Sequence, residues 1–306
     1  MKVLVTGGSG HIGKFVVERL VKAGHEVIAL GRVKNPFKPA KGLTYLSLDI
    51  TNAEAIDKAL AEYRPDAVVH LAAALADDCE RDPAYCLEVN VTALQRLLDS
   101  SIRRGVGRFV FMSSQGVYDP DAPEPVKEES AGRPILMYGI TKYCGELIGL
   151  WYARRGLIDF RALRPSVVFG PARFRGPSAE YSSLIIERAL KGEKVVIKNP
   201  NDRVNYIYVR DVAEATLKLL EAPSAPSRVY NAGGFAMTVL EFVNMVKKFF
   251  PNMEYVVEPG WTTRYPAAID NGRIERELGW RPQYLYEKAV EDYIRTVKEG
   301  SDVFYL

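Results

Sequence analysis

The chain has 306 residues, of which 47% are hydrophobic and 26% are charged. This composition is ordinary for a globular protein with a large core, and the length corresponds to about two domains at ~150 residues each. Because 41 basic residues face 38 acidic ones, the net charge is only +3, and neither nucleic acid nor a membrane surface is expected as a partner. No apolar run reaches the ~20 residues of a membrane-spanning helix. The chain starts directly with a short apolar run and a glycine-rich turn rather than a leader peptide, so we expect a soluble cytoplasmic protein.

Cysteine and histidine are rare in the sequence. The three cysteines, Cys79, Cys86 and Cys144, form no C-x-x-C pair, and the three histidines are far apart. The pattern therefore predicts neither a disulfide framework nor a metal site.

The first half of the chain alternates short β-branched runs with longer segments that have apolar residues at helical spacing. Strands are expected at residues 3–6, 26–30, 44–48, 67–71, 108–112 and 159–164. Helices are expected at residues 12–23, 53–63, 85–103 and 138–155. Such alternation predicts an α/β fold with a doubly wound parallel sheet of the Rossmann type.

Proline and glycine crowd residues 165–177, as expected where a chain leaves one core for another. We therefore expect a first domain at residues 1–165, to which residues 205–234 return. A smaller C-terminal α/β domain would comprise residues 166–204 and 235–306. Further regular segments are expected at residues 211–220, 229–231, 238–250 and 284–299.

A glycine-rich turn, T-G-G-S-G-H-I-G at residues 6–13, connects the first expected strand to the first expected helix. Glycines in this position permit a tight turn and let backbone amides at a helix N-terminus approach a pyrophosphate. Residues 8–14 also fit the stem of a phosphate-binding P-loop, but Phe15 stands where that motif needs a hydroxyl for magnesium. We interpret the turn as part of a dinucleotide site rather than a nucleotide triphosphatase. Its candidate residues are Gly7, Gly10, His11, Ile12 and Gly13.

The end of the second expected strand bears on the choice of cofactor. Gly31 stands near the position where NAD-binding sites carry an acidic side chain for the ribose. Arg32, with Lys34 nearby, could pair with a 2′-phosphate, so NADP is favoured over NAD, although a surface arginine fits the same sequence. Asp49 is a candidate partner of the adenine amino group, and a helix cap before Thr51 fits equally well.

Tyr138 and Lys142 stand four residues apart, so both project from one face of the expected helix. A nearby ammonium lowers the pKa of a tyrosine from its usual ~10 and prepares it for acid–base catalysis. Ser113 and Ser114 follow the preceding strand and can place a hydroxyl beside this tyrosine. Since ligands of such sheets bind at the carboxyl ends of the strands, these residues form a candidate catalytic site.

These motifs resemble the extended short-chain dehydrogenase/reductases, and in particular their NAD-dependent epimerase/dehydratase branch. The resemblance covers nearly the whole chain. Besides residues 6–13, it is carried by H-L-A-A at 70–73, N-V-T-A at 90–93, S-S-Q-G-V-Y at 113–118, Y-G-I-T-K at 138–142, R-P-S-V-V-F-G-P at 164–171, R-V-N-Y-I-Y-V-R-D-V-A at 203–213, Y-N-A-G-G at 230–234 and L-G-W-R-P at 278–282.

The resemblance implies a role for each site residue. Tyr138 would be the catalytic acid and base, Lys142 its ribose-binding partner, and Ser114 the assisting hydroxyl. The remaining cofactor contacts would come from Ile50, Leu71, Ala72, Ala73, Asn90, Ser113, Pro165 and Val168. Substrate contacts would come from Ser114, Gln115, Tyr138, Arg203 and Arg264. The resemblance also implies a homodimer packed through the expected helices at 85–103 and 138–155.

Departures from the family pattern narrow the reaction. Dehydratases of this branch carry an Asp-Glu pair where this chain has Gln115-Gly116, so elimination lacks its acid and base. Reductase-epimerases use a Cys after the serines together with a His, and this chain has neither there. What remains is hydride transfer, either transient or net. The resemblance implies a nucleotide-sugar 4-epimerase of the UDP-glucose/UDP-galactose type, acting by transient hydride transfer through a 4-keto intermediate.

Two alternatives remain open. Val167 stands where the family usually has an asparagine that contacts the substrate, and Val204 stands where an aspartate is usual. Leu75 replaces a lysine often found near the cofactor. These changes are compatible with an NADP-dependent sugar or carbonyl dehydrogenase/reductase with net cofactor turnover. The other alternative is a non-catalytic dinucleotide-sensing protein on the same fold. Retention of Tyr138 and Lys142 argues against it, because sensing does not need them.

Overall fold

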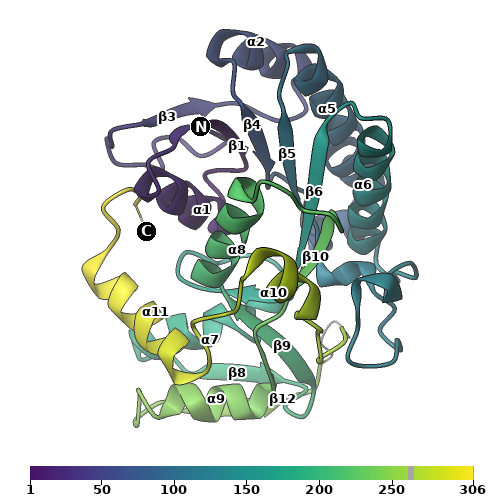
Figure 1. The fold of residues 1–306 in the computed structure, drawn as a ribbon. Coiled ribbons are helices and arrows are strands. Elements are labelled where there is room, and N and C mark those ends of the chain that lie inside the picture. Colours follow the sequence, from purple (N-terminus) through teal and green to yellow (C-terminus); the bar gives the residue numbers. More distant parts are fainter. Residues whose placement is uncertain (261–264, 306) are drawn as a thin grey trace.

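The computed structural model describes residues 1–260 and 265–305. Within these residues, seven strands form one parallel sheet in the order β10-β6-β5-β4-β1-β2-β3. The strands are β1 (Lys2–Thr6), β2 (Glu26–Gly31), β3 (Leu43–Ser47), β4 (Ala67–His70), β5 (Arg108–Met112), β6 (Asp159–Pro165) and β10 (Val229–Ala232). The predicted doubly wound parallel fold is confirmed (Figure 1).

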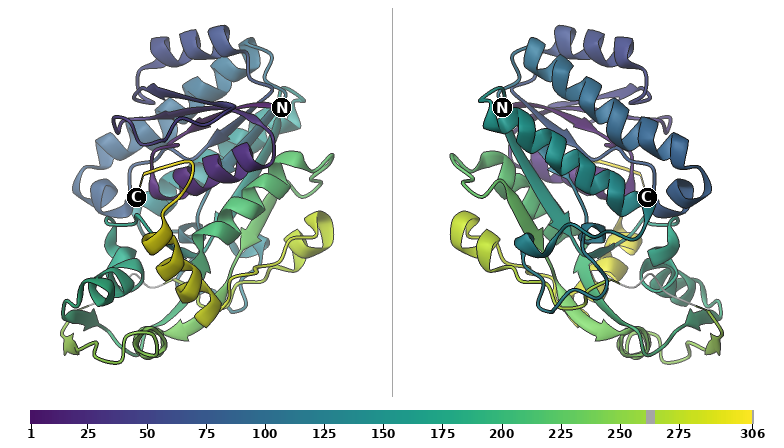
Figure 2. Two further views of the ribbon diagram at one scale, coloured as in Figure 1. Left: turned by 90° about the vertical axis from the view of Figure 1, so that its left-hand side faces the viewer. Right: turned by 90° about the vertical axis from the view of Figure 1, so that its right-hand side faces the viewer.

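Helices cover both faces of this sheet, which explains why its strands are almost continuously apolar. In β1, Val3 and Val5 belong to the core on one face, whereas Leu4 belongs to the core on the other. The first face is covered by α1 (His11–Lys22) and α8 (Val209–Glu221). The opposite face is covered by α2 (Ala53–Tyr63), α5 (Ala93–Arg103) and α6 (Met137–Arg154) (Figures 1 and 2). Among the described residues, no helix combines the length and the apolar character that crossing a bilayer requires.

Two smaller sheets lie below the main one in Figure 1. The first contains β11 (Phe235–Thr238), β9 (Arg203–Tyr208) and β7 (Val167–Phe169), and the second pairs β12 (Tyr255–Glu258) with β8 (Val195–Lys198). The helices of this region are α7 (Ser183–Lys191), α9 (Val239–Lys247), α10 (Gly272–Leu278) and α11 (Glu287–Glu299). Of residues 205–234, α8 and β10 pack with the main sheet, but residues 205–208 belong to β9 and pair outside it. The division into two domains stays a prediction.

The single helix expected at residues 85–103 is wrong in detail. The chain instead forms α3 (Ala76–Arg81), α4 (Pro83–Leu87), a π-helical turn (Glu88–Thr92) and then α5. The side chain of Asn90, in this turn, is buried and accepts a hydrogen bond from Ala74 N–H at 2.8 Å. Its amide also donates to Thr141 Oγ1 at 3.0 Å. The π-helical turn therefore points a polar side chain inward, which a helical repeat of apolar residues cannot reveal.

The expectation of no disulfide is also wrong. Cys79 and Cys86 form a disulfide across α3 and α4, with their Cα atoms 4.8 Å apart, and both residues are buried. The two short helices fold back on each other and bring together cysteines that are seven residues apart. Cys144 is the remaining thiol.

Candidate active site

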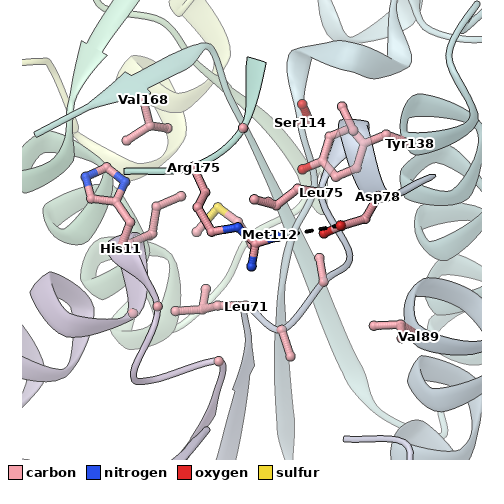
Figure 3. Close-up of a pocket in the computed structure, with 18 of the residues that line it drawn as sticks. His11, Leu71, Leu75, Asp78, Val89, Met112, Ser114, Tyr138, Val168 and Arg175 are labelled. Atoms are coloured by element: carbon pink, nitrogen blue, oxygen red, sulfur yellow. Dashed lines mark ion pairs between the residues drawn. The ribbon is translucent and has the colours of Figure 1, made fainter. Parts of the chain in front are cut away.

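A cavity of about 560 Å³ lies at the carboxyl end of the main sheet. The strand order reverses between β1 and β4, because β1 continues to β2 on one side while β4 and β5 extend the sheet on the other. Doubly wound sheets bind their ligands in the crevice outside such a switch point. The segments that follow β1, β4, β5 and β6 form its walls, and Figure 3 shows Leu71, Met112, Ser114 and Val168 around it.

The glycine turn forms one wall of the cavity and is packed too tightly for side chains. Gly7 has a φ of +69°, and a Cβ there would lie 2.6 Å from Ala72 N. A Cβ on Gly13 would lie 2.1 Å from Gly7 O. Since α1 starts in this turn, its N-terminal amides face the cavity and suit a pyrophosphate. The residues present therefore fit a dinucleotide cofactor.

Unsatisfied polar atoms in the wall also indicate a ligand. Within the described residues, Gln115 Oε1 and Ser166 Oγ are buried without a hydrogen-bond partner, and both residues line the cavity. Buried polar groups without partners are rare in native proteins. A polar ligand in the cavity would satisfy them.

The end of the cavity beside β2 is where cofactor choice would be decided. A Cβ at Gly31 would lie 2.0 Å from Ser9 Oγ, so this serine occupies the space of any larger side chain. Arg32 Nη1 donates to the Tyr85 hydroxyl at 3.2 Å and lies 3.8 Å from the Asp49 carboxylate. The Arg32 side chain is 65% exposed and remains available to a phosphate.

The helix-cap alternative for Asp49 is wrong. Asp49 Oδ1 accepts hydrogen bonds from the N–H of Thr51 at 2.9 Å and from its hydroxyl at 2.8 Å. Asn52 caps α2 instead, because its side chain accepts from Ala55 N–H at 3.1 Å. Asp49 and its neighbour Ile50 both line the cavity.

The catalytic candidates meet at the start of α6. Tyr138 lies in the first turn of this helix, and Ser114 ends the segment that follows β5. A Cβ on Gly139 would lie 2.0 Å from Gly116 O, so only glycine lets the helix approach this segment so closely. The approach lets the Ser114 hydroxyl hydrogen-bond to Tyr138, and both side chains point into the cavity in Figure 3.

The electrostatics of the tyrosine differ from the expectation. Burial raises the pKa of Tyr138, while the hydrogen bond from Ser114 and the charge of Arg173 oppose this rise. Burial lowers the pKa of Lys142 to about 7, against the opposing influence of Glu146. The Lys142 ammonium donates to Met112 O at 2.8 Å. The predicted net lowering of the Tyr138 pKa is therefore wrong for the protein alone, because burial outweighs the opposing groups.

A buried ion pair lies behind this site. Arg164 donates to Glu146 through Nε at 2.7 Å and through Nη2 at 2.5 Å. The Ser113 hydroxyl donates to the same carboxylate at 2.5 Å. Glu146 lies one helical turn beyond Lys142, so the pair connects α6, β6 and the end of β5. This network holds fixed the segments that carry Tyr138 and Ser114.

Comparison with protein families identifies the chain. The family model described as the NAD-dependent epimerase/dehydratase family matches residues 3–233, more than half of the chain. The chain belongs to this family. The predicted membership of the extended short-chain dehydrogenase/reductases is thereby confirmed.

Relatives within the family carry two different reactions in their names. A UDP-glucose 4-epimerase from Thermotoga maritima, solved with UDP-glucose, has a TM-score of 0.88 and 28% identity, covering 98% of this chain and 99% of that chain. A UDP-glucose 4-epimerase from Thermus thermophilus, solved with NAD, has a TM-score of 0.88 and 26% identity, covering 98% and 100%. A mitochondrial L-threonine 3-dehydrogenase from Bos taurus is 27% identical over 295 residues, which is 92% of this chain and 79% of the relative. The family thus indicates an enzyme that uses a nicotinamide cofactor.

Most of the predicted site residues line the cavity of this epimerase/dehydratase family member. They are Gly7, Gly10, His11, Ile12, Gly13, Gly31, Arg32, Asp49, Ile50, Leu71, Ala72, Ala73, Ser113, Ser114, Gln115, Tyr138, Lys142, Pro165 and Val168. Asn90 lies behind the wall, where it binds the backbone of Ala74. Arg203 is not among the lining residues, because it lies at the exposed start of β9 opposite Thr238. Arg264 lies outside the described residues.

Several lining residues were given no site role from the sequence. Ser166 lies within the R-P-S-V-V-F-G-P motif without an assigned role, and Tyr265 carries no motif signal. Arg173 and Arg175 lie in the proline- and glycine-rich segment, whose conformation no periodicity reveals. Arg175 extends across the cavity and pairs with Asp78 at 3.6 Å (Figure 3). Within the described residues, no group of three or more His, Cys, Asp or Glu side chains is placed to hold a metal ion.

Proposed function

We propose that the protein oxidises a secondary hydroxyl of a nucleotide sugar and acts as a 4-epimerase of the UDP-glucose/UDP-galactose type. The observation that carries this proposal is the position of Tyr138 and Ser114, which face the same cavity as the glycine turn. A proton acceptor and a hydrogen-bond donor thus stand beside the place suited to a dinucleotide.

The residues of the chain have distinct tasks in this reaction. The Tyr138 oxygen takes the proton of the substrate hydroxyl, and Ser114 donates a hydrogen bond to the same oxygen. The Lys142 ammonium, held by Met112 O, favours the tyrosinate once it is charged. A nicotinamide cofactor, when bound, supplies the acceptor and donor of hydride. Tyr138 later returns the proton to the carbonyl oxygen of the 4-keto sugar.

Epimerisation also requires that the keto sugar turn over in the cavity before its carbonyl is reduced. Gly116 faces Tyr138 and Tyr265, and a Cβ there would make only ordinary contacts of 3.4–3.7 Å. The missing side chain leaves room beside the reacting centre. The likeness to the UDP-glucose-bound Thermotoga enzyme over almost the whole chain supports a nucleotide sugar as substrate.

The test is incubation of the purified protein with UDP-galactose, with and without added NAD or NADP. Sugar identity is followed by chromatography and reduced cofactor by absorbance. The proposal predicts UDP-glucose without accumulation of reduced cofactor. Oxidation of substrate with stoichiometric reduced cofactor, or no conversion at all, would contradict it.

The second candidate is an NADP-dependent dehydrogenase with net cofactor turnover. It is favoured by the position of Arg203 outside the cavity wall, because this residue was expected to contact the nucleotide sugar. The likeness to the L-threonine 3-dehydrogenase supports it as well. L-Threonine in place of UDP-galactose, in the same absorbance assay, distinguishes the two candidates.

The proposed cofactor is NADP in preference to NAD. Gly31 supplies no carboxylate, and the exposed Arg32 guanidinium can approach a 2′-phosphate. The NAD bound to the Thermus relative favours the opposite choice. The Arg32→Ala variant is expected to weaken NADP binding far more than NAD binding, and equal affinities of the parent protein for both cofactors would refute the preference.

The proposed assembly is a homodimer packed through α6 and its neighbouring segment. On α6, Leu147 and Trp151 are 51% and 47% exposed, and Leu87 on α4 is 44% exposed. Large apolar side chains on neighbouring elements are typical of an interface. Sedimentation equilibrium should give twice the 34.2 kDa chain mass, and a monomer at micromolar concentration would contradict the assignment.

A further inference from the structure

The segment between β7 and α7 places an arginine in the cavity. Arg173 lines the wall together with Tyr138 and Tyr265. Its guanidinium donates to Val168 O through Nη1 and to Ser178 Oγ through Nη2 at 2.6 Å. The preceding Ala172 has a φ of +65°, a left-handed conformation that an alanine rarely adopts. The segment thus holds the guanidinium at one place in spite of local strain, as functional segments often do.

No carboxylate of the described residues compensates the charge of this arginine. Among residues 1–260 and 265–305, no carboxylate forms an ion pair with Arg173. Burial lowers the pKa of Arg173, against the opposing influence of the tyrosines Tyr181, Tyr138, Tyr293 and Tyr265. By contrast, Arg164 and Arg161, which are buried, each pair with a carboxylate. Arg173 is half-buried, and a cation that is partly withdrawn from water without a counter-charge is costly unless a ligand supplies one.

We infer that Arg173 binds an anionic group of the substrate, a carboxylate or a phosphate, and thereby selects charged substrates over neutral sugars and alcohols. The inference rests on the proposed function, because it assumes that Tyr138 acts on a hydroxyl of that substrate. A guanidinium keeps several donors after two bonds to the protein and suits both anions. The pyrophosphate of a cofactor is a less suitable partner, because the glycine turn already offers it backbone amides.

A second consequence concerns the tyrosine itself. The charge of Arg173 opposes the rise that burial causes in the pKa of Tyr138, and it adds to the lowering that burial causes in the pKa of His11. The same residue would therefore hold the substrate and favour the tyrosinate that accepts its proton. An anion bound at Arg173 would weaken the influence of its charge on Tyr138, so substrate binding and turnover must be measured separately.

The test compares the wild type with Arg173→Gln, Arg173→Lys and the control Arg281→Gln. Arg281 is 73% exposed and pairs with Glu275 outside the cavity wall. NADH and NADPH affinities are measured first by fluorescence. UDP-galactose, UDP, L-threonine and galactose are then titrated into the protein saturated with the reduced cofactor, and turnover is measured separately.

Arg173→Gln is expected to keep its cofactor affinity while losing roughly 10- to 100-fold in affinity for the anionic probe that the wild type binds. Arg173→Lys should retain part of this affinity, and Arg281→Gln all of it. Binding of UDP-galactose and UDP assigns the anion to a phosphate, whereas binding of L-threonine assigns it to a carboxylate.

Three results would overturn the inference. The first is an anion affinity of Arg173→Gln equal to that of the wild type. The second is a loss of cofactor affinity that matches the loss of anion affinity, which would assign Arg173 to the cofactor pyrophosphate. The third is equal binding of galactose and the anions by the wild type. Failure of the wild type to turn over any probe would refute the proposed function instead. In that case the binding titrations still decide the role of Arg173, and a wild type that binds no anion counts against it.

Discussion

Replacing Glu146 by glutamine is expected to destabilise the protein strongly. Glu146 and Arg164 side chains are 1% and 4% exposed, and two hydrogen bonds of 2.5 and 2.7 Å join them. Glutamine preserves the shape but removes the charge, and its amide nitrogen faces a guanidinium donor. Arg164 then retains only neutral acceptors, which are Tyr118 Oη at 3.1 Å and Glu128 O at 2.7 Å.

The magnitude follows from the burial of the pair. Removing one partner of a buried ion pair costs about 3–5 kcal/mol, because the other charge stays uncompensated. At ~2.1 cal/mol/K per residue, 306 residues give an entropy of unfolding of about 0.64 kcal/mol/K. Tm should therefore fall by about 5–8 °C in differential scanning calorimetry.

The matched control is Glu54→Gln. Glu54 forms an ion pair with Lys58 at 2.7 Å, but their side chains are 80% and 74% exposed. Exposed pairs contribute little, so the control should leave Tm unchanged. If Glu146→Gln lowers Tm no more than the control does, the reasoning from burial is wrong.

Three further predictions concern the glycine turn, the lysine and the cysteines. In Gly13→Ala, the new Cβ would lie 2.1 Å from Gly7 O. The resulting strain of about 1–3 kcal/mol should weaken NADH binding roughly 5- to 150-fold, as measured by fluorescence titration. Unchanged affinity would show that the turn relaxes freely. The pKa of Lys142 is lowered to about 7, so above this pH the folded state binds fewer protons than the unfolded state. The wild type should therefore be less stable to urea than Lys142→Met at pH 7, and the difference in free energy of unfolding should narrow as pH rises to about 10. A difference that widens with pH would refute the lowered pKa. Because Cys79 and Cys86 are joined, mass spectrometry after alkylation of the protein unfolded without reductant should find one modified cysteine, and three would exclude the disulfide.

The main sheet was predictable because its signals are local. The β-branched runs are short, most are buried on both faces, and each is close to a segment with helical spacing, as in β1 and α1. The glycine turn and the pair of Tyr138 and Lys142 were readable for the same reason. The geometry of the glycine turn depends on residues close in sequence at the end of one strand, and that of the tyrosine and lysine depends on their spacing along one helix.

Features that depend on distant partners were not predictable. The π-helical turn exists because Asn90 reaches Ala74 and Thr141, and the latter lies on another helix. The position of Arg203 follows from the pairing of β9 with β11, which no local pattern specifies. The raised pKa of Tyr138 follows from its burial, and this side chain packs against a cluster of residues distant in sequence, Ala74, Cys79, Cys86 and Val89.

Glycine at position 139 illustrates a signal that was present but not used. Nothing in its own neighbourhood requires glycine, because it lies within a regular helix. Only the approach of Gly116 O, 2.0 Å from where a Cβ would stand, explains the residue. Close contacts between segments far apart in sequence therefore determine which small residues matter to the site.

The most direct test of the account is the Tyr138→Phe variant with UDP-galactose as substrate. Its reduced-cofactor affinity should equal that of the wild type, since the glycine turn and the Lys142 contact to Met112 remain in place. Conversion to UDP-glucose should fall at least about 100-fold, because the proton acceptor is lost. A variant that binds cofactor normally and keeps full conversion would contradict the assignment of Tyr138 as the catalytic acid and base.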